Sequence, residues 1–296
     1  MSKTKCSFIA LIGSPSAGKS TLLNQLVGSK ISIVSPKVQT TRNIINGITI
    51  HEESQLIFVD TPGIFNYKSS KKLEQAIVSH AWSGINDVDQ IAVLVDAKRG
   101  ICENTRLIIK SLKNKNIRVE LILNKTDLVK KTDLLSLADS LQQYGIFNNI
   151  FMVSALKNDG ILELKEFFAK QASIGPWLYP EDEMTTIPKS FLASEIVREK
   201  LFLFLQNELP YNLTVVTDTW EELEDGSAKI YQTIYTNKES HKKIIIGQNG
   251  QFLKKVGKIA RQELEGLFDQ KMHLFLFVKV RENWMDKDEL MPITSS

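Results

Sequence analysis

The sequence is poor in the features that define several classes of protein. It has only two cysteines in 296 residues, Cys6 and Cys102, which are too few for a disulfide framework and lack the CxxC spacing of a metal site. No stretch approaches the roughly 18 consecutive apolar residues that a membrane-spanning helix needs. With 37 Lys and Arg against 34 Asp and Glu, the net charge of +3 indicates no nucleic-acid partner by itself. These shortages favour a globular protein of a reducing compartment.

Length and patterning predict two domains. At about 100–200 residues per domain, 296 residues allow two hydrophobic cores. Short apolar runs alternate with amphipathic segments over 1–173, which predicts an α/β domain with a mostly parallel, six-stranded sheet. Three prolines mark 174–190 as an ordered linker. Residues 191–296 then follow the order helix, strand, strand, helix, helix, strand, which indicates a smaller α+β domain.

The pattern over the first domain also gives the individual elements. The expected strands are 8–13, 43–51, 55–60, 90–96, 118–124 and 149–154, and the expected helices lie near 19–28, 71–84, 102–114, 133–143 and 161–172. Only a few residues separate the second strand from the third. Those two strands should therefore be antiparallel, since a parallel pair needs a longer crossover.

The first expected strand leads directly into a glycine-rich segment. Residues 13–20 fit the phosphate-binding pattern GxxxxGK[ST], between a strand and a helix. Glycines let the backbone approach phosphates, Lys19 places a charge near the β- and γ-phosphates, and the Ser20 hydroxyl suits Mg²⁺. A chance glycine-rich turn is the alternative interpretation. The segment contributes Gly13, Ser14, Pro15, Ser16, Ala17, Gly18, Lys19 and Ser20 to a nucleotide site.

Three more motifs follow strands whose carboxyl ends should meet at one sheet edge. Residues 60–63 offer a carboxylate for Mg²⁺ and a glycine N–H for the γ-phosphate. Residues 124–127 select guanine, because a carboxylate accepts from its N1–H and N2–H₂, whereas adenine has an acceptor at N1. We expect Asn124 to brace the loops and the 154–155 backbone to reach guanine O6. The site thus adds Asp60, Thr61, Pro62, Gly63, Ile64, Asn124, Lys125, Thr126, Asp127, Ser154 and Ala155.

A polar segment at 35–42 has the features of a nucleotide-dependent switch. A Thr hydroxyl there can complete the Mg²⁺ shell only when the γ-phosphate is present; Thr41 is the first choice and Thr40 the second. A plain surface loop is the alternative. Ile64 stands where Ras-like enzymes carry the Gln that orients water, so we expect slow hydrolysis that a partner or monovalent cation raises. The expected catalytic groups are Lys19, Thr41 and Gly63, and the expected Mg²⁺ ligands are Ser20, Thr41 and Asp60.

Residues 247–250, Gly-Gln-Asn-Gly, lie between two expected helices. Such GxxG loops clamp about four nucleotides of single-stranded RNA in KH modules, although the pattern alone recurs by chance. The element order matches a type II KH fold, and residues 238–261 carry a net charge of +6 within a 180–296 segment of net −4. A solvated helix face is the alternative. The expected RNA-binding residues are Gly247, Gln248, Asn249, Gly250, Lys242, Lys243, Lys254, Lys255 and Lys258.

Taken together, these motifs resemble the bacterial Era family of GTPases over nearly the whole chain. The resemblance rests on GSPSAGKS, QTTR, DTPG, NKTD and VSA in the first half and on FLASEIVREKL, ELPY and IIIGQNG in the second. It implies GTP/GDP and Mg²⁺ as cofactors, and nucleotide-regulated binding to the 3′ region of 16S ribosomal RNA during assembly of the 30S subunit. It also implies a cytoplasmic monomer with peripheral association to the inner face of the cell membrane.

Two points leave room for other outcomes. Ser16 stands where most relatives carry an Asn that helps to hold potassium in some related enzymes, so the sequence leaves open whether a monovalent cation raises hydrolysis in this chain. A GTP-gated adaptor whose second domain binds a protein or the membrane surface is the main alternative function. A P-loop ATPase or kinase is a further alternative, which the guanine-selective Asn124 and Asp127 disfavour.

Overall fold

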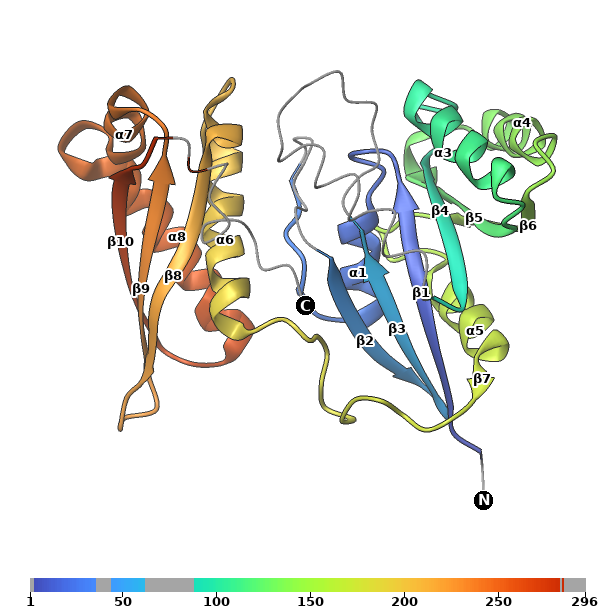
Figure 1. Cartoon of the computed structure of the whole chain (residues 1–296), viewed down its shortest axis with the longest axis horizontal. Coiled ribbons are helices and arrows are strands. Elements are labelled where there is room, and N and C mark those ends of the chain that lie inside the picture. Colours follow the sequence, from blue (N-terminus) through green and yellow to red (C-terminus); the bar gives the residue numbers. More distant parts are fainter. Residues whose placement is uncertain (1–2, 36–43, 62–87, 283, 285–296) are drawn as a thin grey trace. The chain divides into compact units, whose positions relative to one another are not determined.

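The computed structural model describes residues 3–35, 44–61, 88–282 and 284, which form two compact units (Figure 1). The first unit runs from the N-terminal strand to Thr186. The second contains the residues from Ile187 onward. Residues 33–35 also group with the second unit, where the Val34 amide donates to the Glu199 carboxylate (2.7 Å).

A mostly parallel sheet forms the centre of the first unit. Its strands follow the order β2-β3-β1-β4-β5-β6, and β2 is antiparallel to β3, as the short connection predicts. The strands are β1 (Lys5–Gly13), β2 (Ile45–His51), β3 (Ser54–Asp60), β4 (Gln90–Asp96), β5 (Val119–Asn124) and β6 (Phe147–Val153). The six predicted strands are all present. A two-residue strand, β7 (Ser173–Ile174), pairs antiparallel with β1 in addition to them; two residues are too few to give a periodic pattern in the sequence.

Helices cover both faces of this sheet. They are α1 (Lys19–Val27), α3 (Glu103–Asn114), α4 (Lys131–Gln142) and α5 (Ile161–Gln171). Apolar residues of α3 and α4 pack with those of β1, β4 and β5 in one core, whereas α1 and α5 lie against β2 and β3. The helix predicted near 71–84 lies outside the described residues. The strands β1, β3, β4 and β5 all end at the same edge, which positions the loops discussed below.

The proline-rich segment after β7 is attached to the first unit. The Gln55 side chain donates to the Tyr179 carbonyl (2.8 Å) and accepts from the amides of Leu178 (2.8 Å) and Tyr179 (3.1 Å). Further along, the Thr185 hydroxyl donates to the Asn46 carbonyl (2.8 Å). These bonds hold the segment along the β2–β3 side of the sheet.

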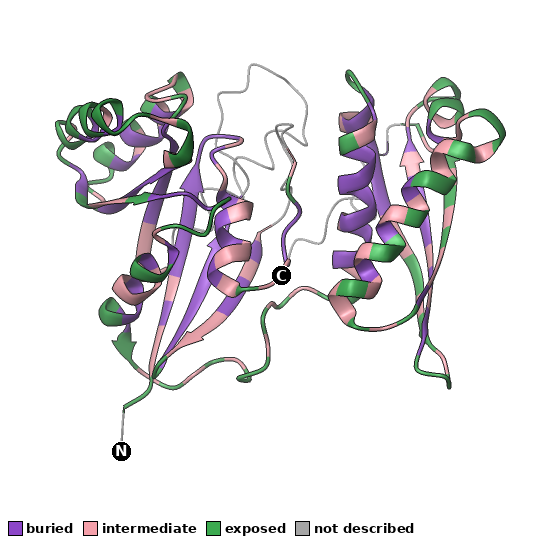
Figure 2. Cartoon of the chain, turned by 180° about the vertical axis from the view of Figure 1, so that it is seen from behind, coloured by how far each residue is buried: buried purple, intermediate pink, exposed green. Residues whose placement is uncertain are grey.

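The second unit has the predicted order of elements. A three-stranded sheet, β10-β9-β8, pairs β9 with β10 in parallel and with β8 antiparallel. Its elements are α6 (Lys189–Phe204), β8 (Leu213–Glu222), β9 (Ala228–Thr236), α7 (Glu239–Ile246), α8 (Gln251–Phe268) and β10 (Met272–Val280). The helices pack on one face, and Figure 2 shows α6 buried along most of its length.

Candidate nucleotide site and nucleic-acid groove

The phosphate loop joins β1 to α1 and holds its lysine in a buried position. Lys19 is 6% exposed, and its Nζ donates to the carbonyls of Gly13 (3.0 Å) and Ser14 (3.3 Å). Burial lowers the pKa of Lys19 to about 8, although the negative charge of Asp60 acts in the opposite direction. The loop therefore keeps an ammonium group at the start of α1 with little water around it.

Gly18 allows the loop to approach the end of β5. Its φ of +99° lies in the left-handed region, and a Cβ built there would lie 2.3 Å from Asn124 Nδ2. Any other residue would both strain the backbone and push the Asn124 side chain away. The second glycine of the GxxxxGK[ST] pattern is therefore explained by this contact.

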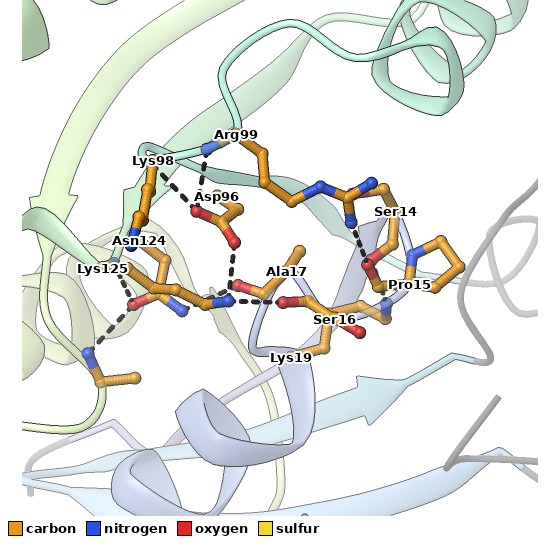
Figure 3. A network of polar contacts seen from close by, with 11 residues as sticks. Ser14, Pro15, Ser16, Ala17, Lys19, Asp96, Lys98, Arg99, Asn124 and Lys125 are labelled. Atoms are coloured by element: carbon orange, nitrogen blue, oxygen red, sulfur yellow. Dashed lines mark hydrogen bonds and ion pairs between the residues drawn. The ribbon is translucent and has the colours of Figure 1, made fainter. Parts of the chain in front are cut away.

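Asn124 links three of the sequence motifs (Figure 3). Its Nδ2 donates to the Ala17 carbonyl of the phosphate loop (2.9 Å), and its Oδ1 accepts from the amides of Lys125 (2.8 Å) and Ala155 (3.0 Å). Asn124 is only 1% exposed, so these bonds are formed away from water, where they are strongest. The phosphate loop, residues 124–127 and residues 154–155 thus form one connected edge.

Lys125 contacts the phosphate loop directly and also pairs with a residue that the sequence analysis missed. Its Nζ donates to the Ser16 carbonyl (2.8 Å) and pairs with Asp96 at the end of β4 (2.7 Å). The other Asp96 oxygen accepts from the amide of Arg99 (3.2 Å), whose guanidinium donates to the Pro15 carbonyl (3.3 Å). Asp96 could have been found from the sequence, because it is a carboxylate at the carboxyl end of a predicted strand. That strand, β4, ends at the same sheet edge as β1 and β5.

The Asp127 carboxylate, which the sequence analysis expects to select guanine, is oriented by a serine hydroxyl. Ser154 Oγ donates to Asp127 Oδ1 (2.5 Å), and Ser154 is buried whereas Asp127 is exposed. Each carboxylate oxygen has two acceptor sites, so Asp127 can still accept two bonds from a base. The sequence analysis placed Ser154 here for its backbone and missed this role of its side chain. Thr126 lies between Lys125 and Asp127 in a short 3₁₀ turn.

Oxygen ligands suited to Mg²⁺ meet beside the phosphate loop. Ser20 Oγ lies 2.8 Å from Asp60 Oδ2, and Ser32 Oγ donates to the same carboxylate oxygen (3.2 Å). The Thr61 hydroxyl donates a hydrogen bond to the Leu11 carbonyl (2.9 Å). Hydroxyl and carboxylate oxygens are the ligands Mg²⁺ prefers, so the residues present fit this ion. The expected Thr40, Thr41, Pro62, Gly63 and Ile64 lie outside the described residues.

The GxxG turn of the second unit precedes α8 and lies beside a groove. Gly247 combines φ +72° with ψ 174°, a region open essentially to glycine, and a Cβ there would lie 2.6 Å from Phe252 Cβ. Gln248 and Asn249 are exposed at the tip of the turn. The groove runs between α8 and β10, with a volume of about 520 Å³. It is lined by Gly250, Leu253, Lys254, Gly257, Lys258, Arg261, Leu274, Phe275 and Leu276.

The expected RNA-binding lysines separate into different places. Lys254 and Lys258 line the groove, together with Arg261, which the expected set omits. Lys255 instead lies over the Phe204 ring of α6 (4.6 Å from Nζ to the centroid). Lys242 and Lys243 lie on α7. Helical spacing explains the division, because residues 254, 258 and 261 share one face of α8.

Comparisons with known proteins match both units. A family model described as 50S ribosome-binding GTPase matches residues 8–125, and a KH domain model matches residues 208–285. GTPase Era of Mesorhizobium japonicum is 49% identical over 286 residues, which cover 97% of this chain and 92% of that protein. GTPase Era of Brucella suis is 48% identical over 287 residues, with the same coverage of each chain.

Two solved structures also match over 97% of this chain and 97% of their own. One is Era in complex with MgGDPNP and nucleotides 1506–1542 of 16S ribosomal RNA, with a TM-score of 0.91 and 36% sequence identity. The other is Era of Aquifex aeolicus bound to GDP and aluminium fluoride, also with a TM-score of 0.91 and 36% identity.

The phosphate loop, the Asn124-centred edge and the GxxG groove together define a P-loop GTPase domain followed by a KH domain. This confirms the predicted fold class. At about half identity over nearly its whole length, the chain belongs to the Era family of GTPases. It is a GTP-hydrolysing enzyme.

Proposed function

We propose that this chain is a GTP-dependent regulator that binds the 3′ region of 16S ribosomal RNA through its KH domain during 30S subunit assembly. The observation that carries the proposal is the presence, in one chain, of a hydrogen-bonded guanine-type edge and a basic groove behind a GxxG turn. The likeness to Era solved with a 16S RNA segment supports the same RNA. We also propose the domain limits that the sequence predicts: a GTPase domain over 1–173, a linker over 174–190 and a KH domain over 191–296.

At the nucleotide site, we assign the phosphates to residues 13–20 and the base to residues 124–127 and 154–155. Asp127 would accept the guanine N1–H and N2–H₂ while Ser154 holds its orientation. Ser20 and Asp60, with Thr41 in the GTP state, would hold Mg²⁺, which screens the phosphate charge when bound. Gly63 would donate to the γ-phosphate. Competition between GTP and ATP for a fluorescent guanine nucleotide tests this, and equal displacement by ATP would contradict it.

Hydrolysis should be slow in the free protein. Ile64 has no group that could orient water, so positioning depends on Lys19, backbone amides and Mg²⁺. Single-turnover assays in sodium and in potassium measure both the rate and the cation dependence left open by Ser16. A turnover on the order of tens per second without a partner would overturn the expectation.

The RNA site is tested by charge at the GxxG turn. Gln248→Asp together with Asn249→Asp places two negative charges where the backbone should meet phosphates, so single-stranded 16S RNA should bind at least tenfold more weakly, with GTP binding unchanged. The control is Ser136→Asp together with Ser140→Asp, which adds the same charge on the exposed face of α4 in the other unit. Unchanged RNA binding in the first variant would favour the GTP-gated adaptor.

We further propose that the protein works as a cytoplasmic monomer with peripheral association to the inner face of the cell membrane. Among the described residues, no helix is long and apolar enough to cross a membrane. The exposed lysines of α7 and α8 would supply the attraction to anionic lipid. Flotation with vesicles of anionic and of neutral lipid tests this, and equal recovery with both would contradict an electrostatic association.

A further inference from the structure

Among the described residues, the helices of the KH unit pack on one face of its sheet, and the other face carries an ordered group of aromatic rings. Along β10, Leu274, Leu276 and Val278 pack against the core, so the alternate residues 273, 275, 277 and 279 point to the other face. On that face Phe275 is 43% exposed and Phe277 is 48% exposed. Two large exposed aromatic residues on one strand are unusual for a surface without a binding role.

These rings are arranged as a stack. Tyr231 on β9 lies opposite Phe275, with ring centroids 4.9 Å apart and planes inclined by 18°. It also lies nearly parallel to Phe277, with centroids 6.2 Å apart and planes inclined by 16°. Tyr231 therefore holds the two exposed rings in a common orientation. We call Tyr231, Phe275 and Phe277 the aromatic platform.

Charge on this face favours a polyanion on the β10 side. Lys229 Nζ lies 5.2 Å from the Tyr231 ring, and Lys279 is exposed two residues beyond Phe277. The acidic residues Asp218 and Glu221 lie on β8, the edge strand farther from β10. Asp218 accepts a hydrogen bond from the Thr233 hydroxyl of β9 (2.7 Å), and Glu221 is opposite Lys229. A phosphate chain would therefore follow β9 and β10 and avoid β8.

The platform is continuous with the GxxG groove. Phe275 belongs to the platform and also lines the groove together with Lys254 and Lys258. A KH groove holds only about four nucleotides, so a longer strand must leave it along a neighbouring surface. The edge strand β10 is the boundary between the groove and the platform.

We propose that the aromatic platform is a second RNA-binding surface, on which bases of single-stranded RNA that extend beyond the groove stack against Phe275 and Phe277. Lys229 and Lys279 face the phosphates of the same strand. Stacking on aromatic rings is tolerant of sequence, since every base has a π-face. The inference rests on the proposed RNA-binding function and adds a longer footprint to it.

Nested single-stranded oligonucleotides from the 3′ region of 16S RNA test the proposal with the full chain. The two probes are the shortest oligonucleotide that binds and one that is about eight nucleotides longer. Phe277 is the residue to change, because it belongs to the platform and does not line the groove. Phe277→Ala should lower the affinity for the long probe about tenfold and leave that for the short probe unchanged. Leu203→Ala, an exposed apolar residue on α6, is the control and should change neither.

Each result has a distinct meaning. Equal binding of the long probe by Phe277→Ala and the unchanged protein overturns the platform. Failure of every oligonucleotide in the nested series to bind the unchanged protein overturns the proposed RNA function itself. Sedimentation of the RNA-free protein provides a further check. A dimer that Phe277→Ala dissociates would assign the face to self-association and overturn the proposal.

Phe277→Trp gives a readout that does not depend on loss of binding. The indole keeps the stacking surface, so the long probe should bind with unchanged affinity and shift the fluorescence of this tryptophan relative to the unchanged protein. The short probe should leave that signal unaltered. An identical signal change with both probes would contradict stacking at the platform, even if Phe277→Ala were too unstable to measure.

Discussion

The nucleotide edge of the first unit and the proposed RNA surface of the second use opposite designs. At the nucleotide edge, Lys19, Asp60, Asn124 and Ser154 are all buried, and side-chain hydrogen bonds fix each of them. At the groove, the cations are exposed on one helix face. A small ligand of fixed shape needs groups that are already in place, whereas a flexible polyanion is attracted by charges that remain hydrated.

This difference decides how each region should respond to substitution. A change at the nucleotide edge disturbs several bonds at once, because Asn124 alone joins three loops. A change in the groove removes one of several similar charges. We therefore expect substitutions in the first region to cause large losses of nucleotide affinity. Substitutions in the second should cause smaller, salt-dependent losses of RNA affinity.

The largest effect is expected from Gly18→Ala. The new methyl group would meet Asn124 Nδ2 at 2.3 Å in a backbone conformation that strains any L-residue, so the bond from Asn124 to the phosphate loop should break. We expect GTP affinity to fall at least about a hundredfold, since displaced phosphate-binding amides and a strained turn act together. Titration with a fluorescent GTP analogue measures it.

Gly28→Ala provides the matched control for that substitution. Gly28 also has a positive φ, +84°, but a Cβ there would have no atom within 4 Å. It should therefore cost about 1 kcal/mol of unfolding free energy through backbone strain and leave GTP affinity unchanged. An equal loss of GTP affinity in both variants would show that general instability, and not the Asn124 contact, is responsible.

The second prediction concerns pH. Lys19 has a pKa of about 8 because burial disfavours its charged form, and the phosphates need that charge. Below pH 8 the ammonium is present before binding. Above it, binding must take up a proton, so GDP affinity should be about tenfold lower at pH 9 than at pH 7.

Lys19→Arg serves as the reference for the pH series, because an arginine keeps its charge throughout and reports the loss of the guanine N1 proton alone. Its GDP affinity should be lower overall and should change less between the two pH values. Parallel pH profiles for the two proteins would contradict a lowered pKa for Lys19.

A smaller loss of GDP affinity is expected when the Asp127 carboxylate loses the hydrogen bond from Ser154. Ser154→Ala removes the hydroxyl that donates to Asp127 Oδ1, and one net hydrogen bond of about 1 kcal/mol corresponds to roughly fivefold weaker GDP binding. Ser140→Ala removes a hydroxyl from exposed α4 and should change nothing. Calorimetric titration with GDP distinguishes them; unchanged binding by Ser154→Ala would mean that Asp127 is oriented by its own turn.

Much of the architecture could be predicted because it depends on patterns along the chain. Residues 13–20 and 124–127 follow apolar strands, and parallel strands bring their carboxyl ends to one edge. The contacts of Asp96 with Lys125 and of Ser154 with Asp127 join distant segments, so they become visible only when strand order and register are known. The binding of 178–185 to Gln55 and Asn46 is of the same kind.

The smallest expected effect on RNA binding distinguishes Lys258 from Lys255, which contribute the same charge to α8. Lys258 lines the groove, whereas Lys255 lies over the Phe204 ring. Lys258→Gln should weaken RNA binding about threefold and reduce by about one the slope of log affinity against log salt concentration, because one phosphate contact is lost. Lys255→Gln removes the same charge from the same helix and should leave the slope unchanged. RNA titrations at several salt concentrations measure both slopes, and equal changes in the two variants would mean that the net charge of α8, and not the groove, attracts the RNA.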